Sequence, residues 1–286
     1  MKMLVTGATG HLGAKVVETL LKSVPANQIA VSVRDPNKAE GLKARGVEVR
    51  QGDFDDPKSL DTAFAGVDRI LIISVTGDDE ARIRQQVNAV EAAARAKVKF
   101  IAYTSLTNAA DSKMFLASPH QATEKAIQAT GIPYSFLRNN WYLENELSSI
   151  QAALAGAPWV TSAGSGKAGW ALRQEYAAAA AAVLAGNGHE HTIYELSGKL
   201  HTQEELVSAI SDVTGKAVEV RQVDDAVYAE TMGKAGVPDF LLPFLTGIQL
   251  GIREGELEVE SNDLEKLLGR PATPLREALS QLLGGA

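Results

Sequence analysis

A glycine-rich loop lies near the start of the chain, between a short apolar run and an amphipathic segment. Its glycines recur three residues apart in the sequence GATGHLG. Glycines allow a tight turn and a close backbone approach to a pyrophosphate, and a helix N-terminus behind them offers free N–H groups and partial positive charge. The loop therefore predicts a dinucleotide site, and a glycine-rich turn without a ligand is the alternative. The residues expected to line the phosphates are Gly7, Thr9, Gly10, His11, Leu12 and Gly13.

The residues after the second apolar run bear on which dinucleotide binds. NAD-binding proteins usually carry an acid here that accepts from the ribose 2′-hydroxyl, whereas this chain has Arg34 followed by Asp35. A guanidinium can pair with a 2′-phosphate, so Arg34, assisted by Lys38, favours NADPH over NADH. The alternative is that Asp35 binds the ribose and Arg34 is solvated.

Further polar and apolar residues follow three later apolar runs. Ligands of open α/β sheets lie beyond the carboxyl ends of the strands, so these residues should meet the rest of the cofactor. An Asp–Phe pair could bind and cover the adenine, or form a turn over a buried ring; the hydroxyls could line the nicotinamide ribose, or make local turn bonds. These candidates are Asp53, Phe54, Ile73, Ser74, Thr104 and Ser105.

The elements that must position these residues alternate regularly through the first 140 residues. Such alternation predicts an α/β fold with a Rossmann-like, doubly wound parallel sheet. Strands are expected at 3–6, 29–33, 47–51, 69–74, 100–105 and 134–138, and helices at 12–23, 37–45, 57–65, 79–96 and 120–130.

The second half of the chain is less regular and predicts a smaller C-terminal α/β substrate lobe. We divide the chain into a nucleotide-binding domain, residues 1–150, and this lobe, residues 151–286, from which part of the chain could return to the main sheet. Strands are expected at 157–161, 192–196 and 217–223, and helices at 173–185, 202–214, 224–235 and 238–252.

Composition removes several classes of function. The 286 residues carry a formal net charge of −7, which disfavours nucleic acid as a partner. No apolar run is long enough to span a bilayer, so no membrane insertion is expected and the cytoplasm is the simplest location. The chain has no cysteine, which excludes disulfides and thiolate chemistry, and no pattern predicts a metal site. A homodimer would be the commonest form of self-association.

Several motifs together resemble the NmrA-like family of atypical short-chain dehydrogenase/reductases, over nearly the whole chain. They are TGATGHLG, VRDP, GDF, FIAYTS, LRNNWY, a TEK segment, and the RQEYA pattern that begins at Arg173. The resemblance implies that the segment after residue 138 flanks the nicotinamide and opens the substrate cleft. The cofactor candidates there are Asn139 and Asn140, and Trp141 or Tyr142 could form a flat wall for a planar substrate, unless these aromatics only pack the two lobes together. Trp170 and Arg173 could line the cleft from the C-terminal side, although Arg173 could equally form a structural ion pair.

The wider superfamily uses a Tyr-x-x-x-Lys pair in which the lysine helps the tyrosine to donate a proton. Lys125 stands in the matching segment, but Gln121 replaces the tyrosine. Lys125 is therefore expected to bind the nicotinamide ribose or stabilise a product anion, unless it is a surface lysine paired with an acid. His120 could donate a proton, and a polar helix cap or a surface histidine is the alternative. Lys125, Asn139 and Tyr142 are the catalytic candidates.

The absent tyrosine favours acceptors that need no strong acid. A quinone accepts hydride to give a delocalised anion, and a cationic dye gives a neutral product. The sequence and the resemblance together imply an NADPH-dependent reductase of quinones or similar planar electrophiles, without flavin or metal. The alternative is a non-catalytic NAD(P)-binding redox sensor that regulates a protein partner.

Overall fold

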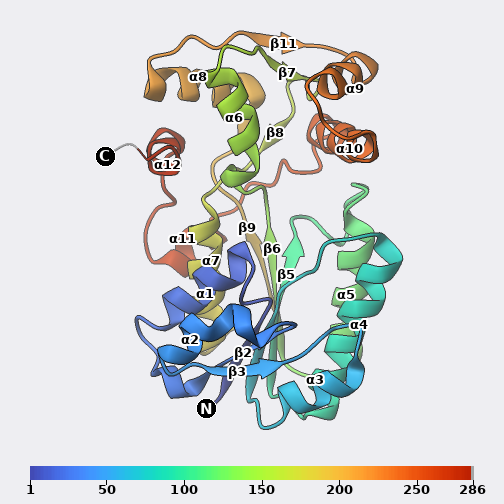
Figure 1. The fold of residues 1–286 in the computed structure, drawn as a ribbon, viewed down its shortest axis with the longest axis vertical. Helices are drawn as coiled ribbons and strands as arrows, with labels where there is room; N and C mark the ends of the chain where they lie inside the picture. The colour runs from blue at the N-terminus through green and yellow to red at the C-terminus, as the bar shows by residue number, and fades with distance from the viewer. Residues whose placement is uncertain (285–286) are drawn as a thin grey trace.

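A seven-stranded sheet forms the larger part of the molecule in the computed structural model, which describes residues 1–284 (Figure 1). All of its strand pairs are parallel, and the chain reverses direction across the sheet between β1 and β4. The predicted doubly wound sheet is therefore confirmed. In spatial order the strands are β3 (Glu48–Gln51), β2 (Ile29–Val33), β1 (Met3–Thr6), β4 (Arg69–Ile72), β5 (Phe100–Leu106), β6 (Tyr134–Asn139) and β9 (Thr192–Leu196).

Helices cover both faces of this sheet (Figure 1). The central strands are buried on both sides, as their continuous apolar runs require. One face packs against α1 (His11–Leu20), α2 (Glu40–Ala44), α7 (Arg173–Ala185) and α11 (Asp263–Leu268). The other packs against α3 (Pro57–Phe64), α4 (Asp79–Arg95) and α5 (Ala117–Ala129). The short helices of this half are η1 (Ala26–Gln28) and η2 (Pro36–Ala39).

The smaller lobe stands beyond the carboxyl ends of the large sheet and has a core of its own (Figure 1). It contains two small sheets, one pairing β8 with β10 and one pairing β7 with β11. Its strands are β7 (Trp159–Thr161), β8 (Lys167–Ala168), β10 (His201–Thr202) and β11 (Val220–Gln222). Its helices are η3 (Leu143–Glu146), α6 (Leu147–Leu154), α8 (Gln203–Thr214), α9 (Asp225–Lys234), η4 (Asp239–Leu241), α10 (Leu242–Arg253) and α12 (Leu275–Leu282).

The chain after residue 150 contributes to both halves. Strand β9 pairs with β6 at the edge of the large sheet, and α7 packs against α1. The intervening segments belong to the smaller lobe. Two elements of that lobe differ from the expectation. Of the strand expected at 217–223, only the part that forms β11 is a strand, and the helix expected at 238–252 is divided into η4 and α10. Within residues 1–284 no helix is both long and apolar enough to cross a membrane.

Candidate functional site

The glycine loop has the geometry of an anion cradle. Gly7 has φ +61°, in the left-handed region, and its carbonyl accepts from Gly10 N at 2.9 Å. A Cβ on Gly13 would lie 2.3 Å from the Gly7 oxygen, so only glycine allows α1 to approach the loop this closely. Helix α1 has no side-chain cap and no acid in its first turn. Its free N–H groups therefore fit a pyrophosphate.

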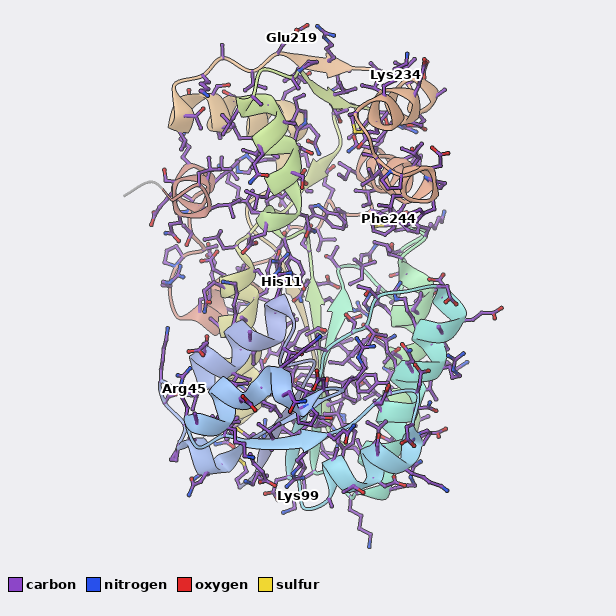
Figure 2. The ribbon with its side chains drawn as sticks, viewed as in Figure 1. His11, Arg45, Lys99, Glu219, Lys234 and Phe244 are labelled. Carbon is purple, nitrogen blue, oxygen red and sulfur yellow. The ribbon has the colours of Figure 1, made fainter. Side chains whose placement is uncertain are left out.

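The other loop residues divide by exposure. Thr9 and His11 are exposed, and His11 lies at the α1 end that faces the smaller lobe (Figure 2). Leu12 is buried and packs in the core beneath α1, so its side chain supports the loop from within. A ligand could meet only the backbone of Leu12.

Arg34 is exposed just beyond β2, and no side-chain bond to it is found within residues 1–284. Asp35, the alternative ribose ligand, instead accepts from Asn37 N at 3.1 Å and caps η2. Lys38 is also exposed. This arrangement leaves the guanidinium of Arg34 available to an anion and gives Asp35 a local structural role.

Asp53 forms a turn and Phe54 packs against the core, which are the two local roles considered for this pair. Asp53 Oδ1 accepts from Asp55 N at 3.0 Å, which closes a turn. Phe54 is half-buried against the core beneath α3 and α4, and its carbonyl accepts from Asn88 Nδ2 at 2.8 Å. An adenine contact by Asp53 and Phe54 stays a prediction.

Hydroxyl groups hold the backbone that follows β4. Ile73 N donates to Thr6 Oγ1, and Ser74 N donates to Thr104 Oγ1, both at 2.9 Å. Thr104 in turn donates to Ser74 Oγ at 3.3 Å. The hydroxyl of Thr104 thus positions the loop of Ile73 and Ser74, and its expected cofactor contact stays a prediction.

Sequence reasoning missed a buried charged network at the carboxyl ends of β5, β6 and β9. Arg138 binds both carboxylate oxygens of Glu124, at 2.9 and 2.7 Å, and donates to Glu195 at 3.0 Å. Burial acts to lower the pKa of Arg138, but bonds and attraction to the two carboxylates outweigh it and raise that pKa. Ser105 Oγ donates to Glu124 Oε1 at 2.6 Å, which leaves the Ser105 oxygen as an acceptor. The signal was an arginine within the mostly buried strand β6 and a glutamate on the neighbouring strand β9.

The structure does not bring Lys125 into this polar cluster. Its side chain is exposed, and neither acid considered as its partner pairs with it: Glu124 faces inward to Arg138, and Glu144 accepts from Arg173 N. Gln121 donates to the carbonyls of Ala109 and Ser112. The catalytic assignment of Lys125 therefore lacks structural support.

His120 is a buried structural residue and a poor proton donor at neutral pH. Arg82 donates to its Nε2 at 3.3 Å, and its Nδ1 lies 2.9 Å from Tyr103 Oη. An arginine can only donate, so Nε2 accepts and Nδ1 carries the proton. Burial, and secondarily the charge of Arg82, lowers the pKa of His120 to about 3.

The two asparagines after β6 have different surroundings. Asn139 Nδ2 donates to Tyr142 Oη at 2.9 Å, while its Oδ1 is buried without a partner within residues 1–284. Such an acceptor fits a ligand that brings an N–H group, as the nicotinamide carboxamide does. Asn140 instead uses its amide on Ser197, Leu257 and Gly169. Asn140 thus links the end of β6 to three other segments of the chain, and its expected cofactor contact stays a prediction.

The expected aromatic wall is mostly part of the lobe core. Trp170 is 4% exposed and Trp141 is half-buried, and both pack in that core. Each indole Nε1 donates to Glu146 Oε1 at 3.1 Å. Contact of Trp170 with a substrate stays a prediction, and Glu146 is a carboxylate that sequence reasoning missed.

Tyr142 and Arg173 lie together at the junction of the two halves. The Arg173 guanidinium stands 5.1 Å from the centre of the Tyr142 ring, and both side chains are half-buried. Burial raises the pKa of Tyr142, which makes it a weaker acid. The pair can line a cleft, but Tyr142 is poorly suited to donate a proton.

The fold and the phosphate loop define a dinucleotide-binding protein of the doubly wound α/β class. The chain belongs to the NmrA-like family, whose family model matches residues 1–260. It is 43% identical over 279 residues to quinone oxidoreductase 2 of Escherichia coli strain K12, covering 97% of each chain.

Two solved structures extend this similarity. The structure of that Escherichia coli enzyme complexed with NADPH has a TM-score of 0.94 and 42% identity, and the match covers 98% of this chain and 99% of that one. The structure of Citrobacter sp. triphenylmethane reductase complexed with NADP(H) has a TM-score of 0.95 and 42% identity, with coverage of 99% and 100%.

Proposed function

We infer that the protein is an NADPH-dependent reductase that transfers hydride directly to a quinone or a similar planar electrophile. The observation that carries this inference is the uncapped α1 N-terminus behind Gly7–Gly13, in a chain similar over its length to a quinone reductase solved with NADPH. Similarity to a triphenylmethane reductase supports the inclusion of planar dyes.

We propose that four parts of the chain hold the cofactor. The loop and the α1 N-terminus bind the pyrophosphate, and Arg34 binds the 2′-phosphate. Ser105 Oγ, whose proton is donated to Glu124, accepts from the nicotinamide ribose. Asn139 Oδ1 accepts from the carboxamide, which supplies the partner this buried oxygen lacks.

The bound cofactor would supply the hydride, and the protein would supply position. Thr6 and Thr104 hold the backbone of Ile73 and Ser74, which then flanks the nicotinamide. Tyr142 and Arg173 form a wall for the acceptor at the junction of the two halves. Neither flavin nor metal is needed for this scheme, because hydride passes directly between two oriented planar reactants.

The test follows the loss of reduced-nicotinamide absorbance by purified, flavin-free protein. NADPH and NADH are compared against 1,4-benzoquinone, menadione and malachite green. Rapid oxidation selective for NADPH is expected. Tight cofactor binding without oxidation of any acceptor would contradict the proposal and favour a non-catalytic redox sensor.

A further inference from the structure

Glu146 stands where the chain leaves the large sheet and enters the smaller lobe. It ends η3, four residues after Tyr142, and the chain then continues into α6 across the junction of the two halves (Figure 1). Its carboxylate therefore lies beyond the carboxyl end of β6, on the side of the sheet where ligands of doubly wound proteins bind.

The hydrogen bonds to Glu146 distinguish its two oxygens. The indole N–H groups of Trp141 and Trp170 both reach Oε1, each at 3.1 Å. Oε2 accepts no hydrogen bond within residues 1–284, and it is not one of the fully buried side-chain atoms that lack a partner. A carboxylic acid whose carbonyl oxygen accepts two N–H groups keeps its hydroxyl on the other oxygen. When Glu146 is protonated, the two indoles thus place its proton on Oε2.

The surroundings favour the protonated form. Burial raises the pKa of Glu146, and this effect outweighs the two indole hydrogen bonds, which lower that pKa. The residue nevertheless keeps an intermediate solvent exposure. The carboxyl is therefore packed by protein and still partly exposed to solvent. Its neighbour Tyr142 shows the same combination.

Few charges face this carboxyl. Helix α6 has no titratable side chain, and on α12 Arg276 pairs with Asp212 while Glu277 is exposed. On α9, the buried Tyr228 is close enough for Glu146 to contribute to raising its pKa to about 12, after the larger effect of burial. Among the described residues 1–284, no basic side chain pairs with Glu146 to hold it in its charged form.

We propose that Glu146 is a catalytic acid that gives its Oε2 proton to the oxygen anion left when a quinone accepts hydride. This role rests on the proposed function. The C–H bond of the reduced nicotinamide breaks, its electron pair and hydrogen go to the quinone, and the O–H bond of Glu146 breaks as the hydroquinone O–H forms. The carboxylate regains its proton from water. The net reaction is NADPH, quinone and H⁺ to NADP⁺ and hydroquinone.

A cationic triphenylmethane dye distinguishes this role from a structural one. The dye accepts hydride at its central carbon and becomes neutral, so its reduction consumes no proton. Glu146→Gln keeps an oxygen that can accept from both indoles but removes the acidic proton. The role therefore predicts loss of quinone reduction with retention of dye reduction.

The experiment measures kcat of the wild type and Glu146→Gln with 1,4-benzoquinone and with malachite green, from pH 5 to 9. We expect kcat for the quinone to fall about 100-fold or more in the variant, the usual range for loss of a general acid, and kcat for the dye to stay within about threefold. Wild-type quinone reduction should decline as pH rises through the pKa of Glu146, and this decline should be absent in the variant.

Glu144→Gln is the matched control, because Glu144 lies on the same short helix and its oxygens accept from Arg173 N. It should change both acceptors equally. Equal loss for quinone and dye in Glu146→Gln, or loss for neither, would overturn the assignment while leaving the reductase function intact. A wild type inert toward both acceptors would overturn the proposed function, and this role with it.

Discussion

Arg34 is the residue on which the choice of cofactor depends. Its guanidinium is exposed beyond β2, and the neighbouring acid is occupied in capping η2. We expect Arg34→Ala to weaken NADPH binding by about 1.5–3 kcal/mol, the usual loss for a charge-assisted bond, or roughly 10- to 150-fold in Kd. NADH binding should change little.

Titration of protein fluorescence with each reduced cofactor measures both constants. Arg45→Ala is the control, since Arg45 is an exposed arginine paired with Glu18 at a distance from the loop (Figure 2). Equal weakening of NADPH and NADH by Arg34→Ala would remove the 2′-phosphate assignment.

Single residues also show where sequence reasoning ends. The spacing of Gly7, Gly10 and Gly13 was enough to predict the phosphate loop, because a local turn requires these glycines. Glu124 and Lys125 are neighbours on α5, so their side chains are separated by about 100° around the helix axis. This rotation places the Glu124 side chain inward and the Lys125 side chain toward solvent. No neighbouring residue indicates that rotation unambiguously.

At the scale of elements, the contact between α1 and the phosphate loop requires glycine at one point. A Cβ on Gly13 would meet Gly7 O at 2.3 Å and Ala8 Cα at 2.8 Å, both of them backbone atoms. We expect Gly13→Ala to destabilise the fold by about 1–3 kcal/mol, the usual range for overpacking, and to weaken NADPH binding at least tenfold as the loop shifts.

Urea unfolding and cofactor titration test this expectation. Gly41→Ala provides the control, because Gly41 lies within α2 and a Cβ there would meet nothing within 4 Å. That change should be neutral or stabilise by up to about 1 kcal/mol. Equal results for the two variants would show that α1 does not need its close approach.

Elements were predictable where their signals were local. Alternating apolar runs and amphipathic segments identified every strand from β1 to β6 and the returning strand β9. The roles of Asn140 and Trp170 were not predictable in this way. Asn140 bonds to Leu257, 117 residues away, and Trp170 bonds to Glu146 across 24 residues. Such partners are determined by tertiary packing, which leaves no periodic pattern in the sequence.

At the scale of the whole molecule, His120 links stability to pH. Its pKa is lowered to about 3 in the folded protein, against about 6.5 in an unfolded chain. The unfolded chain therefore binds the extra proton first as pH falls. The contribution of neutral His120 is fully present above pH 6.5 and is lost toward pH 3, at up to about 1.4 kcal/mol per pH unit.

Between pH 7 and pH 5 this linkage should remove about 2 kcal/mol of unfolding free energy. Urea unfolding of the wild type and His120→Gln at both pH values measures it, since the variant should lose less stability over that interval by this amount. His11→Gln is the control, because the His11 ring is exposed (Figure 2). An identical pH dependence in wild type and His120→Gln would show that His120 titrates alike in both states.

The return of the chain to complete its large sheet has a consequence for biosynthesis. The phosphate loop is made before β6, and β6 gains its outer neighbour only with β9, after residue 196 has been made. Until then β6 is an open edge that can pair with other chains. Helix α11, which packs on α7 and β9, arrives later still. The nucleotide-binding half is thus completed only by segments made well after β6, so a nascent chain stalled between β6 and β9 has an unprotected strand.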